Sequence, residues 1–187
     1  MSNATISRRP RRIGAVCVAG AVMAAVAVAG LGSASAASGD SEKPTATEVG
    51  VSPTEIRIAI IADVDNPIVP GVFQGAVDGV RGAAKYLNSK AGGGGVAGRE
   101  LVVDFIDAKL NANAARNATI TACGQDLAMV GTSTTALSNV DDIVNCTDQA
   151  GAMTGLPDIP AINGAVEGCA PLAYPINPNA AICSTVD

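Results

Sequence analysis

The sequence predicts an α/β fold, an open and mostly parallel sheet with helices on both faces. Three observations predict it: apolar β-branched runs alternate with segments of helical period, a glycine-rich turn separates the first helix from the second strand, and the strands are too apolar to be half exposed. Strands that alternate with helices build βαβ units with right-handed crossovers. The loops after the strands should therefore open on one edge of the sheet.

The first strand is expected at residues 56–62, a run of isoleucine, alanine and one arginine that ends at Asp63. Two prolines, Pro67 and Pro70, then turn the chain. From residue 72 the apolar residues recur with helical period up to Asn88, opposite a polar face, so this helix should pack on the sheet.

The remaining elements follow in the same alternation. Glycines at 92–95 should end the first helix. A second strand at 101–106 leads to Asp107, and a second helix at about 113–123 leads to a third strand at 127–130. A further helix is expected from Ala136 to about Cys146, and a fourth strand at 159–162.

Residues 1–36 have the features of a secretory signal peptide. Four arginines precede an apolar core at 13–31, and Ala34-Ser35-Ala36 is a small-x-small cleavage site. The alternative is a retained membrane anchor, because the apolar run is long for a signal. We expect an exported protein, secreted or associated with the cell envelope. A polar, flexible lead-in at residues 37–50 then precedes a folded part at 51–187.

Charge and composition exclude several function classes. The full chain carries 12 basic and 17 acidic residues, and the signal peptide contains four of the basic ones and no acid, which leaves a charge of −9 on the rest. Nucleic acid is therefore not expected as a partner. The chain contains no histidine, and neither a metal site nor a cofactor is predicted.

Four cysteines follow the signal peptide, which is an even number suited to an oxidising compartment. Three pairings are possible, and the sequence alone does not choose among them. Sequential pairing is our hypothesis, Cys123 with Cys146 and Cys169 with Cys183.

Two motifs suggest chemistry that their context does not support. Residues 93–98 match GxGxxG, but here the glycines leave a helix and open a strand, the reverse of a dinucleotide-binding turn. Residues 131–135 resemble the nucleophile elbow GxSxG, yet Thr135 replaces the last glycine and no histidine is present to act as the base of a triad. We predict no enzymatic activity.

The loop after the third strand is the best candidate for ligand binding. Ser133, Thr134 and Thr135 carry hydroxyls, and the start of the expected helix would add free backbone N–H groups suited to a carboxylate. Ordinary helix capping by one hydroxyl is the alternative.

The loop after the fourth strand, Asn163, Gly164 and Ala165, should open on the same edge, where small residues let a ligand approach the backbone. The acidic residues that follow the strands, Asp63, Asp65 and Asp107, are weaker candidates, because such carboxylates often cap helices or face solvent.

Four features accompany this order of elements: Asn88, the glycines at 92–93, Gly98-Arg99 and the acidic end of the second strand. In this combination the chain resembles the amino-terminal lobe of type I periplasmic binding proteins. The resemblance is greatest to the leucine/isoleucine/valine-type solute-binding components of ABC importers. The resemblance implies a small ligand, often an amino acid, and a membrane permease as partner. It also implies that residues 133–135 and 163–165 contact the ligand.

The resemblance covers residues 55–162, whereas members of that family have a second lobe. We therefore expect the amino-terminal lobe alone, with an irregular proline-rich tail. The alternative function is a secreted sensor or protein-interaction module built on a single lobe, with self-association through its uncovered face.

Overall fold

The computed structural model describes residues 44–137, 140–148, 150–162, 164 and 169–177. The expected signal peptide and most of the expected tail after Asn177 lie outside these residues. No helix in the described part of the chain is long and apolar enough to cross a membrane.

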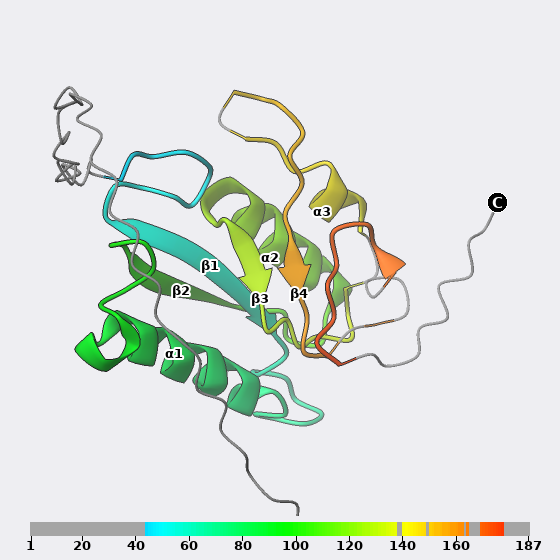
Figure 1. Ribbon diagram of the computed structural model, residues 1–187. Helices are drawn as coiled ribbons and strands as arrows, with labels where there is room; N and C mark the ends of the chain where they lie inside the picture. The colour runs from blue at the N-terminus through cyan, green and yellow to red at the C-terminus, as the bar shows by residue number, and fades with distance from the viewer. Residues whose placement is uncertain (1–43, 138–139, 149, 163, 165–168, 178–187) are drawn as a thin grey trace, which may run out of the picture. The chain divides into compact units, whose positions relative to one another are not determined.

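Four parallel strands form one sheet in the order β2-β1-β3-β4 (Figure 1). The α/β fold class is thus confirmed. The strands and helices alternate along the chain as β1 (Glu55–Ala62), α1 (Gln74–Asn88), η1 (Lys90–Gly92), β2 (Glu100–Asp107), α2 (Ala112–Gln125), β3 (Ala128–Val130), α3 (Asp141–Val144) and β4 (Asp158–Ile159).

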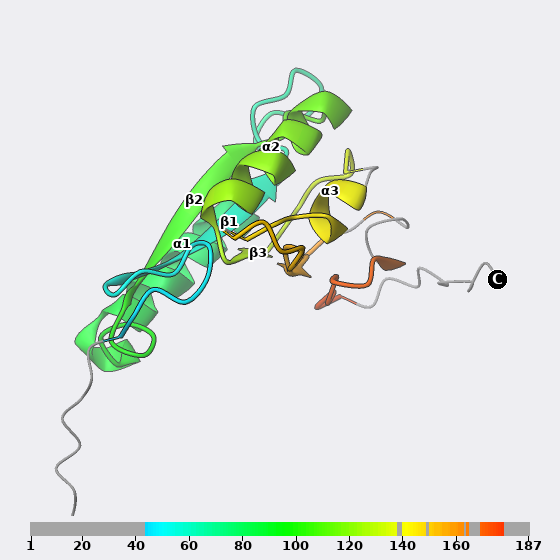
Figure 2. The same ribbon diagram turned by 90° about the horizontal axis from the view of Figure 1, so that it is seen from above.

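The two long helices cover opposite faces of the sheet (Figures 1 and 2). Side chains of β1 alternate between these faces, as the strand period requires. Ile60 and Ala62 pack with Val77 of α1, whereas Ala59 and Ile61 pack with the α2 face, whose buried residues are small. Alanines at 115, 118 and 122 let α2 lie close to the sheet.

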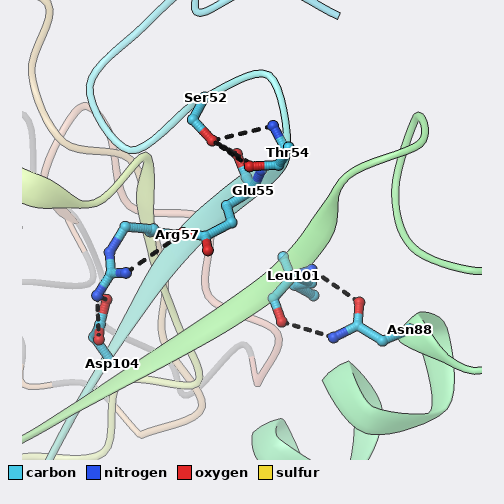
Figure 3. Close-up of polar contacts among 7 residues, drawn as sticks. All are labelled: Ser52, Thr54, Glu55, Arg57, Asn88, Leu101 and Asp104. Carbon is cyan, nitrogen blue, oxygen red and sulfur yellow. Dashed lines mark hydrogen bonds and ion pairs between the residues drawn. The ribbon is translucent and has the colours of Figure 1, made fainter.

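β1 lies between β2 and β3, and five of its eight residues are buried, which explains its unbroken apolar run. β2 forms an edge of the sheet. Asn88, at the end of α1, covers part of this edge: its side chain donates to the carbonyl of Leu101 at 2.9 Å and accepts from the Leu101 N–H at 2.8 Å (Figure 3). These two bonds satisfy edge groups that would otherwise be open to another chain.

Two expected elements differ from the structure. The helix expected from Ala136 to about Cys146 is present only as the four-residue α3, so that prediction is wrong in length and position. Ser133 instead continues the sheet by pairing with Ala62 and Ile162, and the Thr134 hydroxyl bonds the Ala136 N–H, so the chain leaves the sheet without a helical start.

The fourth strand is also shorter than expected. β4 ends at Ile159, before Pro160, which has no N–H to donate to a ladder. Its neighbour on the outer side is the segment 173–176, because Tyr174 N donates to Asp158 O at 2.8 Å and Ile176 N donates to Pro160 O at 3.2 Å. This segment therefore extends the sheet beyond β4.

A disulfide joins Cys123 of α2 to Cys146, with 5.6 Å between their α-carbons. This is the pairing expected from sequential order. Cys169 is also disulfide-bonded, and Cys183 lies outside the described residues.

Candidate functional site

The loops predicted to bind a ligand lie at the point where the chain changes direction in the sheet. The connection after β1 leads to β2 on one side, and the connection after β2 leads across to β3 on the other side. The carboxyl ends of β1 and β3 are neighbours, and their outgoing loops diverge. In open α/β sheets a ligand usually binds outside the carboxyl ends of the strands at such a point.

Asp63 fixes the geometry of this edge. Its side chain is fully buried, and its carboxylate accepts hydrogen bonds from Leu110 N at 2.7 Å and Thr135 N at 3.2 Å. Its own N–H donates to Ser133 O at 3.1 Å. One residue thus connects the loops that follow β1, β2 and β3. Asp63 therefore organises this edge of the sheet, and its oxygens are engaged with the backbone.

Asp107 has a similar role in the neighbouring loop. Its carboxylate accepts from the backbone N–H groups of Val64 at 3.1 Å, Asp65 at 2.8 Å and Lys109 at 2.9 Å. Burial alone would raise the pKa of Asp107, but these three bonds and the charge of Lys109 outweigh it and lower the pKa below 3.8. The carboxylate therefore stabilises the folded state at neutral pH, and this stabilisation is lost as the pH falls through its lowered pKa.

The loop after β2 holds two non-glycine residues in the left-handed region, Lys109 at φ 54° and Leu110 at φ 53°. This conformation is unfavourable for residues with a Cβ. The bonds from Lys109 N to Asp107 and from Leu110 N to Asp63 hold the loop in it. The two aspartates therefore support a strained backbone in the loop after β2.

The four consecutive hydroxyl residues divide into two groups. Thr132, Ser133 and Thr134 are buried, and their hydroxyls bond Asp158 at 2.7 Å, the Gly131 carbonyl at 2.9 Å and the Ala136 N–H at 3.1 Å. Thr135 is exposed, and its hydroxyl makes no hydrogen bond within the described part of the chain. Of the three predicted contact residues in this loop, Thr135 has the hydroxyl that a ligand could reach.

The backbone groups expected to hold a carboxylate are also engaged. Because no helix begins at residues 134–136, the expected helix N-terminus is absent there. The N–H groups of Thr135 and Ala136 bond Asp63 and Thr134 instead. Any ligand contact in this loop would therefore come from the Thr135 side chain.

Gly131 allows this loop to leave β3. Its φ is +76°, and a Cβ at this position would lie 2.6 Å from a methyl carbon of Val80 on α1. Only glycine satisfies both conditions without a shift of the helix. The turn after β3 and the packing of α1 thus both require glycine at position 131.

The second predicted loop is described only at Gly164. Asn163 and Ala165 lie outside the described residues. A Cβ at Gly164 would lie 4.0 Å from Leu137 O, so Gly164 is close to the loop that follows β3. Gly164 is thus near Leu137, which follows the predicted contact residues at 133–135.

The loop after β1 presents apolar side chains. The side chain of Asn66, which is buried, accepts from the N–H groups of Ile68 at 3.2 Å and Val69 at 2.8 Å and donates to Val69 O at 3.0 Å. Ile68 is 75% exposed although its backbone is fixed in this way. Exposed apolar residues on an ordered loop are suited to contact with an apolar ligand group.

A cavity of about 260 Å³ lies elsewhere, beside the disulfide. Its lining includes Glu48 and Val49 of the lead-in, Asp126 at the end of α2, and the disulfide itself. Sequence reasoning singled out neither this cavity nor Asp126. In the parts of the chain that the structure describes, no group of three or more acidic, cysteine or histidine side chains could hold a metal ion.

Comparisons with protein-family models, with curated proteins and with solved structures gave no match to this chain.

Proposed function

We propose that this chain is the amino-terminal lobe of an exported solute-binding protein, which binds a small ligand such as an amino acid and delivers it to the membrane permease of an ABC importer. The observation that supports the proposal is Asp63, which connects the loops after β1, β2 and β3 at the carboxyl edge of a parallel sheet, where open α/β folds usually bind ligands. The strand order, and the presence of helices on both faces of the sheet, agree with the lobe that the resemblance implies.

The exposed polar groups at this edge suit a zwitterion. Lys109 Nζ and Asp65 Oδ2 lie 3.8 Å apart, and both side chains are more than half exposed. An amino acid carries one charge of each sign, so its carboxylate and ammonium group complement this pair, and Thr135 offers a hydroxyl. A branched apolar side chain of the ligand would contact the exposed side chain of Ile68.

The burial and hydrogen bonding of the Ser133 hydroxyl agree with ligand binding without catalysis. Ser133, the position that a nucleophile elbow would use, is buried, and its hydroxyl donates to the Gly131 carbonyl. A serine nucleophile needs a base within hydrogen-bonding reach, and the chain has no histidine. The proposal therefore includes no reaction step.

The substitution Thr135→Val tests the placement of the ligand. Valine keeps the shape of threonine and removes the hydroxyl, and the Thr135 N–H to Asp63 bond is retained. We expect the dissociation constant for the preferred amino acid to rise about tenfold, which corresponds to one lost hydrogen bond. Titration calorimetry against a panel of amino acids measures this change.

Thr121→Val is the matched control, because Thr121 is an exposed threonine on α2 whose hydroxyl bonds only Asn117 O. It should leave the affinity unchanged. Equal affinity of wild type and Thr135→Val would contradict this placement. If none of the amino acids binds the wild type, the proposed ligand class is wrong.

A second candidate, a protein-interaction module that self-associates, is favoured by exposed apolar side chains around β4. Ile159 and Ile162 are 37% and 39% exposed, and Tyr174 and Ile176 on the adjacent segment are 59% and 68% exposed. Neighbouring exposed apolar residues at a sheet edge are typical of contact surfaces.

Sedimentation velocity tests this second candidate. Self-association through the exposed surface of β4 and the segment 173–176 predicts a concentration-dependent sedimentation coefficient that Ile176→Glu reduces to the monomer value. Ile120→Glu, on α2 and 49% exposed, is the control and should not alter it. A monomer at all concentrations would remove the support for self-association.

A further inference from the structure

The outer edge of β2 is open in the part of the chain that the structure describes. β2 is the last strand of the sheet on its side, and its neighbour in the sheet is β1. On the opposite side the segment 173–176 lies beyond β4. Asn88 bonds the N–H and the carbonyl of Leu101, so it closes only the beginning of the β2 edge (Figure 3). A strand edge with unpaired backbone groups is a template for another extended chain.

The alternation of backbone directions along β2 identifies the unpaired groups. Glu100 N and Ala108 N donate toward the β1 side, at 2.8 and 3.0 Å, so the even-numbered residues bond this side. Leu101 belongs to the odd-numbered residues, whose groups face outward. The N–H and carbonyl groups of Val103 and Phe105 therefore point away from β1, and no hydrogen bond within the described residues uses them.

A groove of about 500 Å³ lies beside this edge, between α1 and the first half of β2. Its lining includes Arg81 and Lys85, one helical turn apart on α1. The Arg81 guanidinium lies over the ring of Phe105, 5.4 Å from its centroid. This contact holds a cation next to the unpaired backbone groups of β2.

The basic residues beside the groove lack acidic partners. Carboxylates or backbone carbonyls engage four of the seven lysine and arginine side chains in the described chain: Arg57, Arg99, Lys109 and Arg116. The other three, Arg81, Lys85 and Lys90, belong to α1 and η1 and form no ion pair with a described residue. Glu100 lines the groove but is not paired with them. The edge therefore combines unpaired backbone groups with unpaired positive charge.

We propose that the outer edge of β2 binds an extended acidic segment of a partner protein as an additional strand. The segment pairs with the backbone of Val103 and Phe105, and its carboxylates meet Arg81 and Lys85. Strand residues two positions apart lie about 7 Å apart on one face, and helix residues one turn apart lie about 6 Å apart. Acidic residues at every second position therefore match the two cations.

A second copy of the chain is less suited to this edge. Antiparallel pairing of two β2 strands in one continuous sheet would place the two α1 helices on the same face, so their unpaired cations would repel each other. The proposed surface is separate from the ligand site between β1 and β3, and it does not depend on the proposed function.

An acetylated and amidated heptapeptide with glutamate at every second position and threonine between them tests this proposal. Titration into the ¹⁵N-labelled full chain should shift the amide resonances of Val103 and Phe105 with saturation. Saturating peptide should also raise the protection of these two amides from hydrogen exchange by at least about tenfold. The amides of Val102 and Asp104 face β1 and should keep the protection they have without peptide.

Two controls separate strand addition from simple attraction of charges. The same peptide with methylated backbone nitrogens keeps its carboxylates but cannot donate to β2, so it should not bind. Lys85→Glu, at an exposed position of the groove, should raise the dissociation constant of the unmethylated peptide at least about tenfold. Arg116→Glu makes the same change of charge on α2, where the side chain is 57% exposed, and should leave the affinity unchanged.

Several results would overturn the proposal. They are a failure of the glutamate peptide to bind, equal binding of the methylated peptide, and equal weakening by Lys85→Glu and Arg116→Glu. Strong protection of the Val103 and Phe105 amides before peptide is added would also overturn it. Protection that grows with protein concentration would indicate a second copy at this edge, and protection independent of concentration would indicate a segment of the same chain.

Discussion

Replacement of Asp63 by alanine should destabilise the protein by about 2–4 kcal/mol in urea unfolding at neutral pH. The substitution leaves the Leu110 and Thr135 N–H groups without their acceptor at a buried position. It also removes the support for Leu110 in its left-handed conformation. Because three loops meet at Asp63, the loss should disturb the arrangement of these loops as well as the overall stability.

Two companion variants separate these effects. Asp63→Asn keeps one acceptor oxygen and should cost less than Asp63→Ala. Asp65→Ala removes an 83% exposed side chain that lies 3.8 Å from Lys109, so it should change stability by less than about 0.5 kcal/mol. Similar stabilities for Asp63→Ala and Asp65→Ala would show that the buried carboxylate does not hold the loops.

The double substitution Cys123→Ala/Cys146→Ala should reduce the free energy of unfolding by about 3 kcal/mol. The two residues are 23 positions apart, so the bond restricts a long loop of the unfolded chain. It also joins the end of α2 to the segment after α3, and in the described residues this segment has little regular structure. Urea unfolding followed by circular dichroism measures the loss.

A reduced wild-type protein offers a control for the double variant. If the Cys123–Cys146 bond carries the stabilisation, reduction should lower the urea midpoint of the wild type at least as far as the substitution does. A double variant as stable as the oxidised wild type would contradict the expected contribution of this disulfide.

The elements that local patterns determine were predicted well. The β-branched run before Asp63 gave β1 to within one residue, because a strand buried on both faces needs apolar residues throughout. The apolar period after residue 72 gave α1, and the glycines that follow it form the expected turn. These features depend on neighbours in the sequence.

The features that depend on distant contacts were not predicted. Ser133 pairs with Ala62 and Ile162, so the hydroxyl run enters the sheet and does not begin a helix. In the register of β1 and β2 Arg57 pairs with Val102 and Asp104 pairs with Ala59, so the Arg57–Asp104 ion pair is a diagonal contact between the strands.

An amide NMR titration of the ¹⁵N-labelled chain with amino acids tests the proposed ligand site between β1 and β3. We expect one amino acid to shift the resonances of the loops at 63–70, 107–111 and 133–137 together, with saturation, while those of α2 residues such as Thr121 stay in place. Shifts confined to the cavity beside the disulfide, or no saturable shifts with any amino acid, would contradict a ligand site between β1 and β3.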